Sequence, residues 1–310
     1  ARLYAEEPER GFLPSTGRLH ALDLAEGEGI RIDSGVIEGG EVTPFYDPMI
    51  AKVIAHGETR DEALDRLRDA LLDSIVAGPK TNTRFLTALL DHPDFRAGKL
   101  DTGLIDRNLE ALGAVPPELD RQAVAAGALA LVAEEKARLD AAAISRSGWA
   151  SDPWGDSDGF ALAPGRTGTI RVKADGEEIT LALDAAGEEA FAGESAMDRA
   201  FTLVSAGEDV YVLDRGRQTR VCLVDPLDVS FDDHGSDAGG NVKSPMHGKL
   251  VALFVTDGQV VEKGQRVAIV EAMKMEHPVL APRAGTVESI AFEAGAQLGE
   301  GQRIMSIAEA

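Results

Sequence analysis

A lysine between two methionines is the residue of this sequence best suited to carry chemistry. It is Lys274, within the run Ala272-Met273-Lys274-Met275, and its immediate neighbours are apolar. An unmodified lysine near its usual pKa is mostly protonated and is therefore a poor nucleophile. Its amino group can instead serve as the point at which a prosthetic group is attached.

The residues around Lys274 form an internal repeat. The segment 244–270 is similar to 281–307, at a constant offset of 37 residues. Two similar halves joined by a lysine-bearing turn predict a small all-β domain with the lysine at the tip of a hairpin. The alternative, an ordinary exposed lysine, does not account for the repeat. Six residues are identical across the offset, namely Pro245/Pro282, Gly248/Gly285, Gly258/Gly295, Gly264/Gly301, Gln265/Gln302 and Arg266/Arg303.

Composition limits the classes of function. A chain of 310 residues has room for two or three domains. Its net charge of −22 argues against a nucleic acid or an anionic membrane as partner. No apolar run approaches the roughly 18 residues that span a bilayer, and Cys222, the only cysteine, rules out an intramolecular disulfide. We expect a cytoplasmic protein without a metal site in this chain, and we expect the chain to be part of something longer.

The first segment, residues 1–112, is expected to be α+β. The apolar run 49–55 predicts a strand. Thr59 and Glu62 form a capping box at the start of a helix, whose apolar face is expected to continue to Ile75. A second short helix is predicted for 83–90.

The second segment, 113–232, is expected to be a long helix followed by many short strands. Pro117 suits the first position of a helix, which is predicted to run from 118 to 140. Asp175-Gly176 between two apolar runs is a strong hairpin signal. A small antiparallel barrel wrapped around the helix is the arrangement that we predict.

The remaining chain is predicted to be a flexible linker and a terminal domain. Residues 232–241 contain no large apolar residue and are typical of a linker, which is predicted for 233–242. The domain 243–310 would then be tethered, which suits a lysine that must visit more than one place.

Ala272-Met273-Lys274-Met275 in a duplicated all-β domain resembles the biotin carboxyl carrier domain of biotin-dependent carboxylases. The resemblance implies a flattened barrel and a covalent biotin on Lys274. It also implies that a biotin protein ligase recognises Ala272, Met273 and Met275. A lipoyl carrier domain is the alternative; lipoyl domains share the fold but usually have an Asp-Lys-Ala setting, so methionines on both sides favour biotin.

The N-terminal segment resembles the C-terminal third of an ATP-grasp biotin carboxylase domain, through the runs 2–8, 46–52 and 78–82. The resemblance implies that Arg2 contacts bicarbonate and biotin and stabilises the biotin enolate. A guanidinium is permanently charged and offers a planar fork of donors to such oxygens. Without the resemblance, Arg2 would be taken for a surface residue. Asp47 is expected to form a structural turn.

The resemblance also implies what this chain lacks. ATP and Mg²⁺ belong to the complete enzyme, and the ATP-grasp loop, lysines and glutamates that hold them are not found in this sequence. No Gly-x-x-x-x-Gly-Lys-[Ser/Thr] run replaces them. We therefore expect the chain alone to be inactive with ATP and bicarbonate.

Taken together, the chain resembles the C-terminal part of an acyl-CoA carboxylase α subunit, most like 3-methylcrotonyl-CoA carboxylase of leucine degradation. The implied reaction is ATP-dependent carboxylation of biotin by bicarbonate, followed by transfer of the carboxyl group to an acyl-CoA on a carboxyltransferase β subunit. The runs 101–105, 275–277 and 293–297 favour the methylcrotonyl branch over geranyl-CoA or propionyl-CoA carboxylase. An interaction subunit with an unmodified lysine remains open. A pyruvate carboxylase would need several hundred residues where only about 130 lie between 112 and 243.

Overall fold

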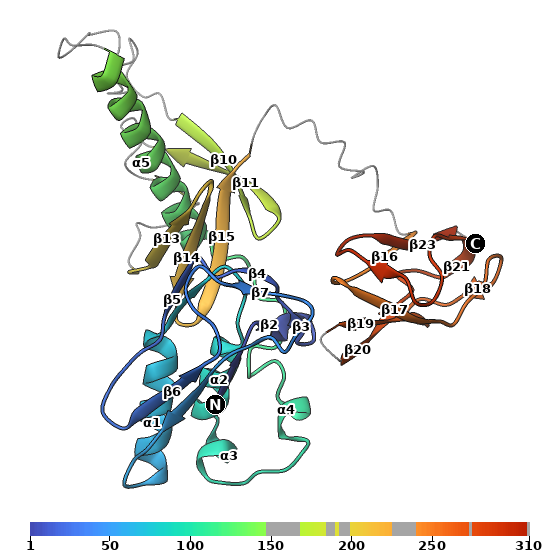
Figure 1. Ribbon diagram of the computed structural model, residues 1–310, viewed down its shortest axis with the longest axis horizontal. Helices are drawn as coiled ribbons and strands as arrows, with labels where there is room; N and C mark the ends of the chain where they lie inside the picture. The colour runs from blue at the N-terminus through green and yellow to red at the C-terminus, as the bar shows by residue number, and fades with distance from the viewer. Residues whose placement is uncertain (147–167, 184–189, 192–198, 225–239, 273–274, 309–310) are drawn as a thin grey trace.

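The computed structural model describes residues 1–146, 168–183, 190–191, 199–224, 240–272 and 275–308. These residues form three successive units (Figure 1). We call them the N-terminal lobe (1–112), the barrel unit (α5 with β10 to β15) and the C-terminal domain (240–308). None of the described helices combines the length and the apolarity needed to cross a bilayer.

A three-stranded antiparallel sheet forms the base of the N-terminal lobe. Its order is β1 (Arg2–Tyr4), β8 (Met49–Ala55) and β6 (Ile30–Ser34), so the predicted strand 49–55 is confirmed as the central strand. Helix α1 (Arg60–Asp73) packs on this sheet through Leu64 and Leu71, which are buried with Val53 of β8. The other elements of the lobe are β2 (Glu6–Glu7), η1 (Pro8–Arg10), β3 (Leu13–Pro14), β4 (Gly17–Arg18), β5 (Ala21–Asp23), β7 (Glu41–Val42), β9 (Ile75–Ala77), α2 (Thr83–Asp91), α3 (Pro93–Arg96) and α4 (Leu104–Arg107).

The start of α1 is as predicted, but its end is earlier. Thr59 is the N-cap, and its hydroxyl oxygen accepts from the Glu62 amide at 3.2 Å. The helix ends at Asp73. The C-cap residue Ser74 has extended backbone angles, and its hydroxyl accepts from the Ala25 amide at 3.1 Å. Ile75 therefore lies in β9, which pairs with β5, and its predicted place on the helix face is wrong.

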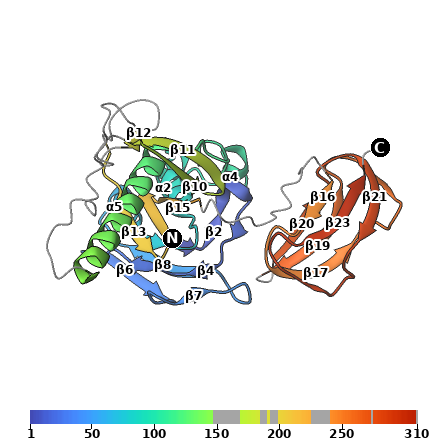
Figure 2. The same ribbon diagram turned by 90° about the horizontal axis from the view of Figure 1, so that it is seen from above.

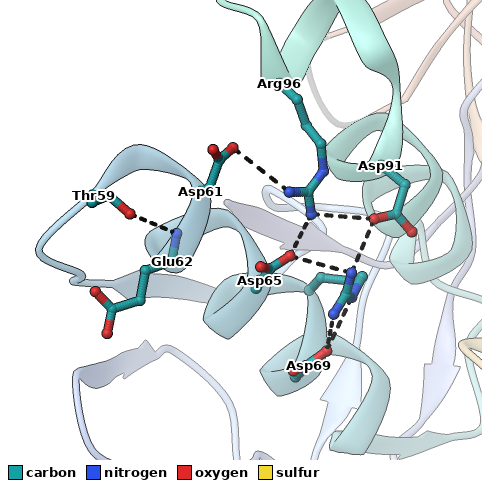
Figure 3. A network of polar contacts seen from close by, with 8 residues as sticks. Thr59, Asp61, Glu62, Asp65, Asp69, Asp91 and Arg96 are labelled. Atoms are coloured by element: carbon teal, nitrogen blue, oxygen red, sulfur yellow. Dashed lines mark hydrogen bonds and ion pairs between the residues drawn. The ribbon is translucent and has the colours of Figure 1, made fainter.

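Ion pairs hold α1, α2 and α3 together (Figure 3). The guanidinium of Arg96 reaches Asp65 at 2.5 Å, Asp91 at 3.5 Å and Asp61 at 3.7 Å. Arg68 also reaches Asp91, at 3.2 Å. The hydrogen bond from Arg96 holds the pKa of Asp65 below its usual value. These contacts fix the helices that follow the sheet.

The barrel unit consists of one helix and one six-stranded antiparallel sheet. The helix is α5 (Arg121–Arg146), and the strands are β10 (Gly168–Ala174), β11 (Glu177–Leu183), β12 (Ala190–Phe191), β13 (Thr202–Ala206), β14 (Asp209–Asp214) and β15 (Arg217–Leu223). The sheet order is β12-β11-β10-β15-β14-β13.

Helix α5 packs against β10, β12, β14 and β15, so the predicted helix wrapped by antiparallel strands is confirmed. Gly127 allows this close approach, because a Cβ there would lie 2.7 Å from a methyl of Val221. The predicted hairpin is also confirmed. Asp175 and Gly176 connect β10 to β11 with φ of 47° and 94°, the positive values that a two-residue hairpin turn needs.

The start of α5 differs from the prediction. It begins at Arg121 rather than after Pro117, because the Asp120 carboxylate accepts from the amides of Gln122 and Ala123, each at 3.1 Å. An aspartate in this position satisfies amides that the first turn leaves unpaired. The local side-chain cap thus decides where the helix starts.

The C-terminal domain is all-β, as predicted. Its two four-stranded sheets have the orders β16-β23-β21-β18 and β20-β19-β17-β22. β16 begins at Asn241, inside the range expected to be linker. The strands are β16 (Asn241–Lys243), β17 (Gly248–Leu253), β18 (Val260–Val261), β19 (Arg266–Ala272), β20 (Met275–Leu280), β21 (Gly285–Ile290), β22 (Gln297–Leu298) and β23 (Arg303–Ala308).

The sequence repeat is reproduced in the strand register. β16 pairs with β23 through Asn241 and Ser306, and β20 pairs with β19 through Pro278 and Ile269, which are the same positions shifted by 37 residues. The β17–β19 and β21–β23 pairs correspond in the same way, including the position of a register shift in each. The predicted two-fold relation between the halves is therefore confirmed.

Candidate functional site

The predicted lysine hairpin is formed by β19 and β20. Ala272 pairs with Met275, Glu271 with Glu276 and Val270 with His277. Met273 and Lys274 lie outside the described residues, in the sequence between the paired Ala272 and Met275. By the two-fold relation, the end of the β19–β20 hairpin at Ala272 and Met275 is equivalent to the opposite end of the domain, where β16 begins and β23 ends. Figure 1 accordingly shows β20 on the side of the domain away from the C-terminus.

The hairpin is supported by the core of the C-terminal domain. Val270 and Ala272 are buried, and Met246 is buried in the same cluster. Gly248 of β17 lies so close to β19 that a Cβ on it would be 2.6 Å from the Glu271 carbonyl oxygen. The backbone on one side of the lysine is therefore held by direct contact with its neighbour.

Two carboxylates and one lysine lie beside the hairpin tip. Lys249 of β17 is exposed and pairs with Glu271 on the side away from β20. Glu271 and Glu276 are exposed and occupy opposite positions on the two strands. His277 lies further along β20, and its Nε2 is buried without a hydrogen-bond partner among the described residues. Burial lowers the pKa of His277, so the imidazole is neutral at neutral pH.

The second predicted site residue, Arg2, lies on the edge strand β1 of the N-terminal lobe. Its side chain is exposed, and Nη1 is 3.5 Å from the Tyr4 hydroxyl. The interaction with Tyr4 raises the pKa of Arg2, so its charge is permanent. Asp47 lies near Arg2, and its carboxylate accepts from the Met49 amide at 2.9 Å, which confirms the turn expected there.

Asn82 holds the strand that carries Arg2. This side chain is 4% exposed; its oxygen accepts from the Tyr4 amide at 3.0 Å. Its nitrogen donates to the Glu6 carboxylate at 2.9 Å and to the Arg2 carbonyl at 3.4 Å. Burial raises the pKa of Glu6. Asn82 belongs to the run 78–82 that carries the resemblance, but its role cannot be predicted locally because its partners are 76 and 78 positions away.

The two predicted sites lie in different units. Arg2 belongs to the N-terminal lobe, whereas the lysine hairpin belongs to the C-terminal domain, and residues 225–239 between them are outside the described part. Chemistry that needs both residues would require the hairpin to reach the lobe.

Comparison with known proteins identifies both end units. The family model "Biotin carboxylase C-terminal domain" matches residues 1–107, and "Biotin-requiring enzyme" matches 240–307. The methylcrotonoyl-CoA carboxylase subunit alpha of Dictyostelium discoideum is 31% identical over 329 residues, covering 94% of this chain and 46% of that protein. The chain belongs to the biotin-dependent carboxylases. The predicted family, biotin as its cofactor and the multi-domain fold are thereby confirmed.

Other relatives at similar identity are named for methylcrotonoyl-CoA or for propionyl-CoA. The methylcrotonoyl-CoA carboxylase subunit alpha of Arabidopsis thaliana is 29% identical and covers 99% of this carboxylase chain and 49% of its own length. The propionyl-CoA carboxylase alpha chain of Ruegeria pomeroyi is 31% identical, with coverages of 98% and 50%. The chain thus spans about half the length of these curated relatives.

Among solved structures, the biotin carboxylase subunit of a pyruvate carboxylase is 38% identical. The match covers 36% of this chain and 25% of the chain of that structure, with a TM-score of 0.35.

Proposed function

We propose that the chain is the biotin-carrying part of an acyl-CoA carboxylase α subunit, with biotin attached to Lys274. The observation that supports this best is the duplicated domain, in which Lys274 falls between the paired residues Ala272 and Met275. The apolar neighbours Ala272, Met273 and Met275 are the residues that a biotin protein ligase would recognise. Biotin fits this hairpin, because Lys274 is adjacent in sequence to the last described pair, Ala272 and Met275, which lies at the end of the domain away from its chain ends.

The attachment chemistry follows from the lysine. After loss of its proton, the Nζ atom would attack the carboxyl carbon of biotin activated by the ligase at the expense of ATP; the activating group leaves, and the resulting amide carries no positive charge. When bound, biotin carries a carboxyl group from bicarbonate to an acyl-CoA. The contribution of the hairpin is to hold the attachment point on two strands anchored in the domain core, while the exposed Glu271 and Glu276 keep its surface in water.

Arg2 is proposed as the residue of the N-terminal lobe that binds bicarbonate and the ureido oxygen of biotin. Its guanidinium is exposed, permanently charged and carried on a strand fixed by Asn82. A fixed guanidinium favours negative charge that develops on an oxygen beside it. The relatives extend beyond the span of this chain, and we place the sites for ATP and Mg²⁺ there.

The acyl-CoA and the partner belong to the same proposal. We place the carboxyl transfer on a carboxyltransferase β subunit. We favour 3-methylcrotonyl-CoA, an intermediate of leucine degradation, on the resemblance of the runs 101–105, 275–277 and 293–297. Propionyl-CoA is the second candidate, because the Ruegeria pomeroyi protein is as similar as the Dictyostelium discoideum one.

Mass spectrometry after expression with a biotin protein ligase tests the attachment. The expected result is one biotin on the tryptic peptide that contains Lys274, and streptavidin capture of the intact chain. Lys274→Arg should abolish capture, whereas Lys263→Arg, an exposed lysine of the same domain, should not. Lipoate on Lys274, or equal labelling of the Lys274→Arg protein, would contradict the proposal. Assay of the complete enzyme with its β subunit on methylcrotonyl-, geranyl- and propionyl-CoA then tests the substrate.

A further inference from the structure

The segment 78–82 touches two parts of the molecule that lie far apart in the sequence. It follows β9 and leads into α2, within the N-terminal lobe. One of its ends contacts the barrel unit and the other contacts β1, the strand that carries Arg2. Figures 1 and 2 both show the barrel unit against the N-terminal lobe, and β14 contacts β9.

The barrel end of the segment is held by a side-chain amide. The Gly78 amide donates to Oε1 of Gln218 at 3.0 Å, and Nε2 of Gln218 donates to the Gly78 carbonyl at 2.8 Å. Both backbone groups of Gly78 are thus paired with a residue 140 positions away. Gly78 has φ of 127°, and a Cβ there would lie 2.1 Å from the Arg18 carbonyl oxygen, so no larger residue fits this position.

The middle of the segment has further contacts with both sides. The Lys80 ammonium lies 3.7 Å from Asp175 in the barrel unit and 3.8 Å from Glu7 in the N-terminal lobe. Its amide donates to the Ser15 hydroxyl at 2.9 Å. Pro79 is buried, and its ring fixes the backbone angle φ. These contacts restrain the backbone between Gly78 and Asn82. A displacement of Gly78 is therefore transmitted to Asn82.

The far end holds the Arg2 strand. Besides its three side-chain contacts with Arg2, Tyr4 and Glu6, Asn82 donates its own amide to the Tyr4 carbonyl at 3.1 Å. The Tyr4 amide and carbonyl are consequently both bonded to Asn82. The position of β1 relative to the segment is set by one buried residue.

We propose that residues 78–82 are a mechanical link through which the barrel unit positions the strand of Arg2, with Gln218 and Asn82 as its two positioning residues. The link itself stands on the contacts above. Only its consequence, that the orientation of the barrel unit sets the orientation of Arg2 for bicarbonate and biotin, rests on the proposed function.

Amide hydrogen exchange followed by NMR on the chain tests the link. Gln218→Ala removes both hydrogen bonds to Gly78 from the barrel side and leaves the lobe sequence intact. The expected result is exchange at the Tyr4 amide faster by roughly two- to thirty-fold, the range found for coupling between linked sites. Exchange at Leu71, buried in α1 of the same lobe, should not change. A general loss of stability would instead accelerate both amides equally.

Two further variants complete the experiment. Gln218→Glu keeps the acceptor for the Gly78 amide and loses the donor, so its effect should be smaller than that of Gln218→Ala. Gln265→Ala removes a comparable side-chain acceptor, 2.9 Å from the Glu262 amide in the C-terminal domain, and should leave Tyr4 unchanged. An unchanged Tyr4 amide in Gln218→Ala, or a parallel change at Leu71, would overturn the link. Neither outcome depends on whether Lys274 carries biotin, so failure of the link and failure of the proposed function can be told apart.

Discussion

Replacing Gly248 by alanine should weaken the C-terminal domain at the strand that leads to the lysine. The added Cβ would lie 2.6 Å from the Glu271 carbonyl oxygen and 2.8 Å from a methyl of Val270, below the 3.0 Å that Cβ contacts keep. The first obstacle is backbone and cannot rotate away, so β17 and β19 must separate. Such overpacking costs about 1–3 kcal/mol, and the smaller freedom of alanine in the unfolded chain offsets about 0.4–1 kcal/mol of it. We expect a net loss of about 1–2 kcal/mol.

The two-fold relation supplies a matched control. Gly285 is the equivalent of Gly248, and a Cβ on it would lie 1.9 Å from the Ala308 carbonyl oxygen, so Gly285→Ala should cost at least as much stability. It acts, however, at the end of the domain away from the lysine. Denaturant unfolding of the C-terminal domain and the rate of labelling by biotin ligase should therefore separate the variants. Both lose stability, but only Gly248→Ala slows labelling under conditions where both are folded. Equal slowing by Gly285→Ala, or no loss of stability in Gly248→Ala, would refute this reasoning.

Three other outcomes are expected. Burial lowers the pKa of His277, so the unfolded chain binds more protons than the folded one below about pH 6.5. The stability of the C-terminal domain should therefore fall as the pH drops through that value. His277→Phe should reduce this dependence of stability on pH in unfolding curves measured at several pH values, and an unchanged dependence would contradict the assignment. Glu276→Lys replaces the like charge opposite Glu271 by an opposite charge and should stabilise the hairpin by about 0.2–1 kcal/mol at low salt, less at high salt; a loss of stability would contradict this expectation. Thr59→Ala removes the N-cap hydrogen bond of α1 and should cost about 1 kcal/mol in thermal unfolding, with Thr59→Ser largely restoring it; equal effects of both substitutions would mean that the hydroxyl is not the cause.

The parts of the fold that were predicted correctly depend on signals close together in the sequence. The cap at Thr59 and the turn at Asp175-Gly176 each involve a few neighbouring residues, and both are present. The repeat of 37 residues is a longer signal, but identical glycines in its two halves specify identical turns. The equivalent strand register of the two halves of the C-terminal domain has the same origin.

The parts that were missed depend on distant partners. Ile75 continues the apolar pattern of α1, but pairing of β9 with β5 places it in a strand. Pro117 is suited to begin a helix, yet Asp120 caps the observed one. Gln218 and Asn82 contact residues 140 and 78 positions away, so no local pattern indicates their roles. Lys274 was singled out by its neighbours, and Arg2 by resemblance to a family.

The duplicated register also determines how far the lysine can reach. One hairpin end of the C-terminal domain is closed by the residues around Lys274, and the equivalent end is open because the chain enters and leaves there. The seven residues of β19 separate these ends by about 23 Å. A circular permutant that joined the present ends and opened the chain at the lysine would keep every strand pair. The domain would then be attached to the rest of the chain at the lysine end. The distance from the attachment point to the lysine would shorten by about the length of the domain.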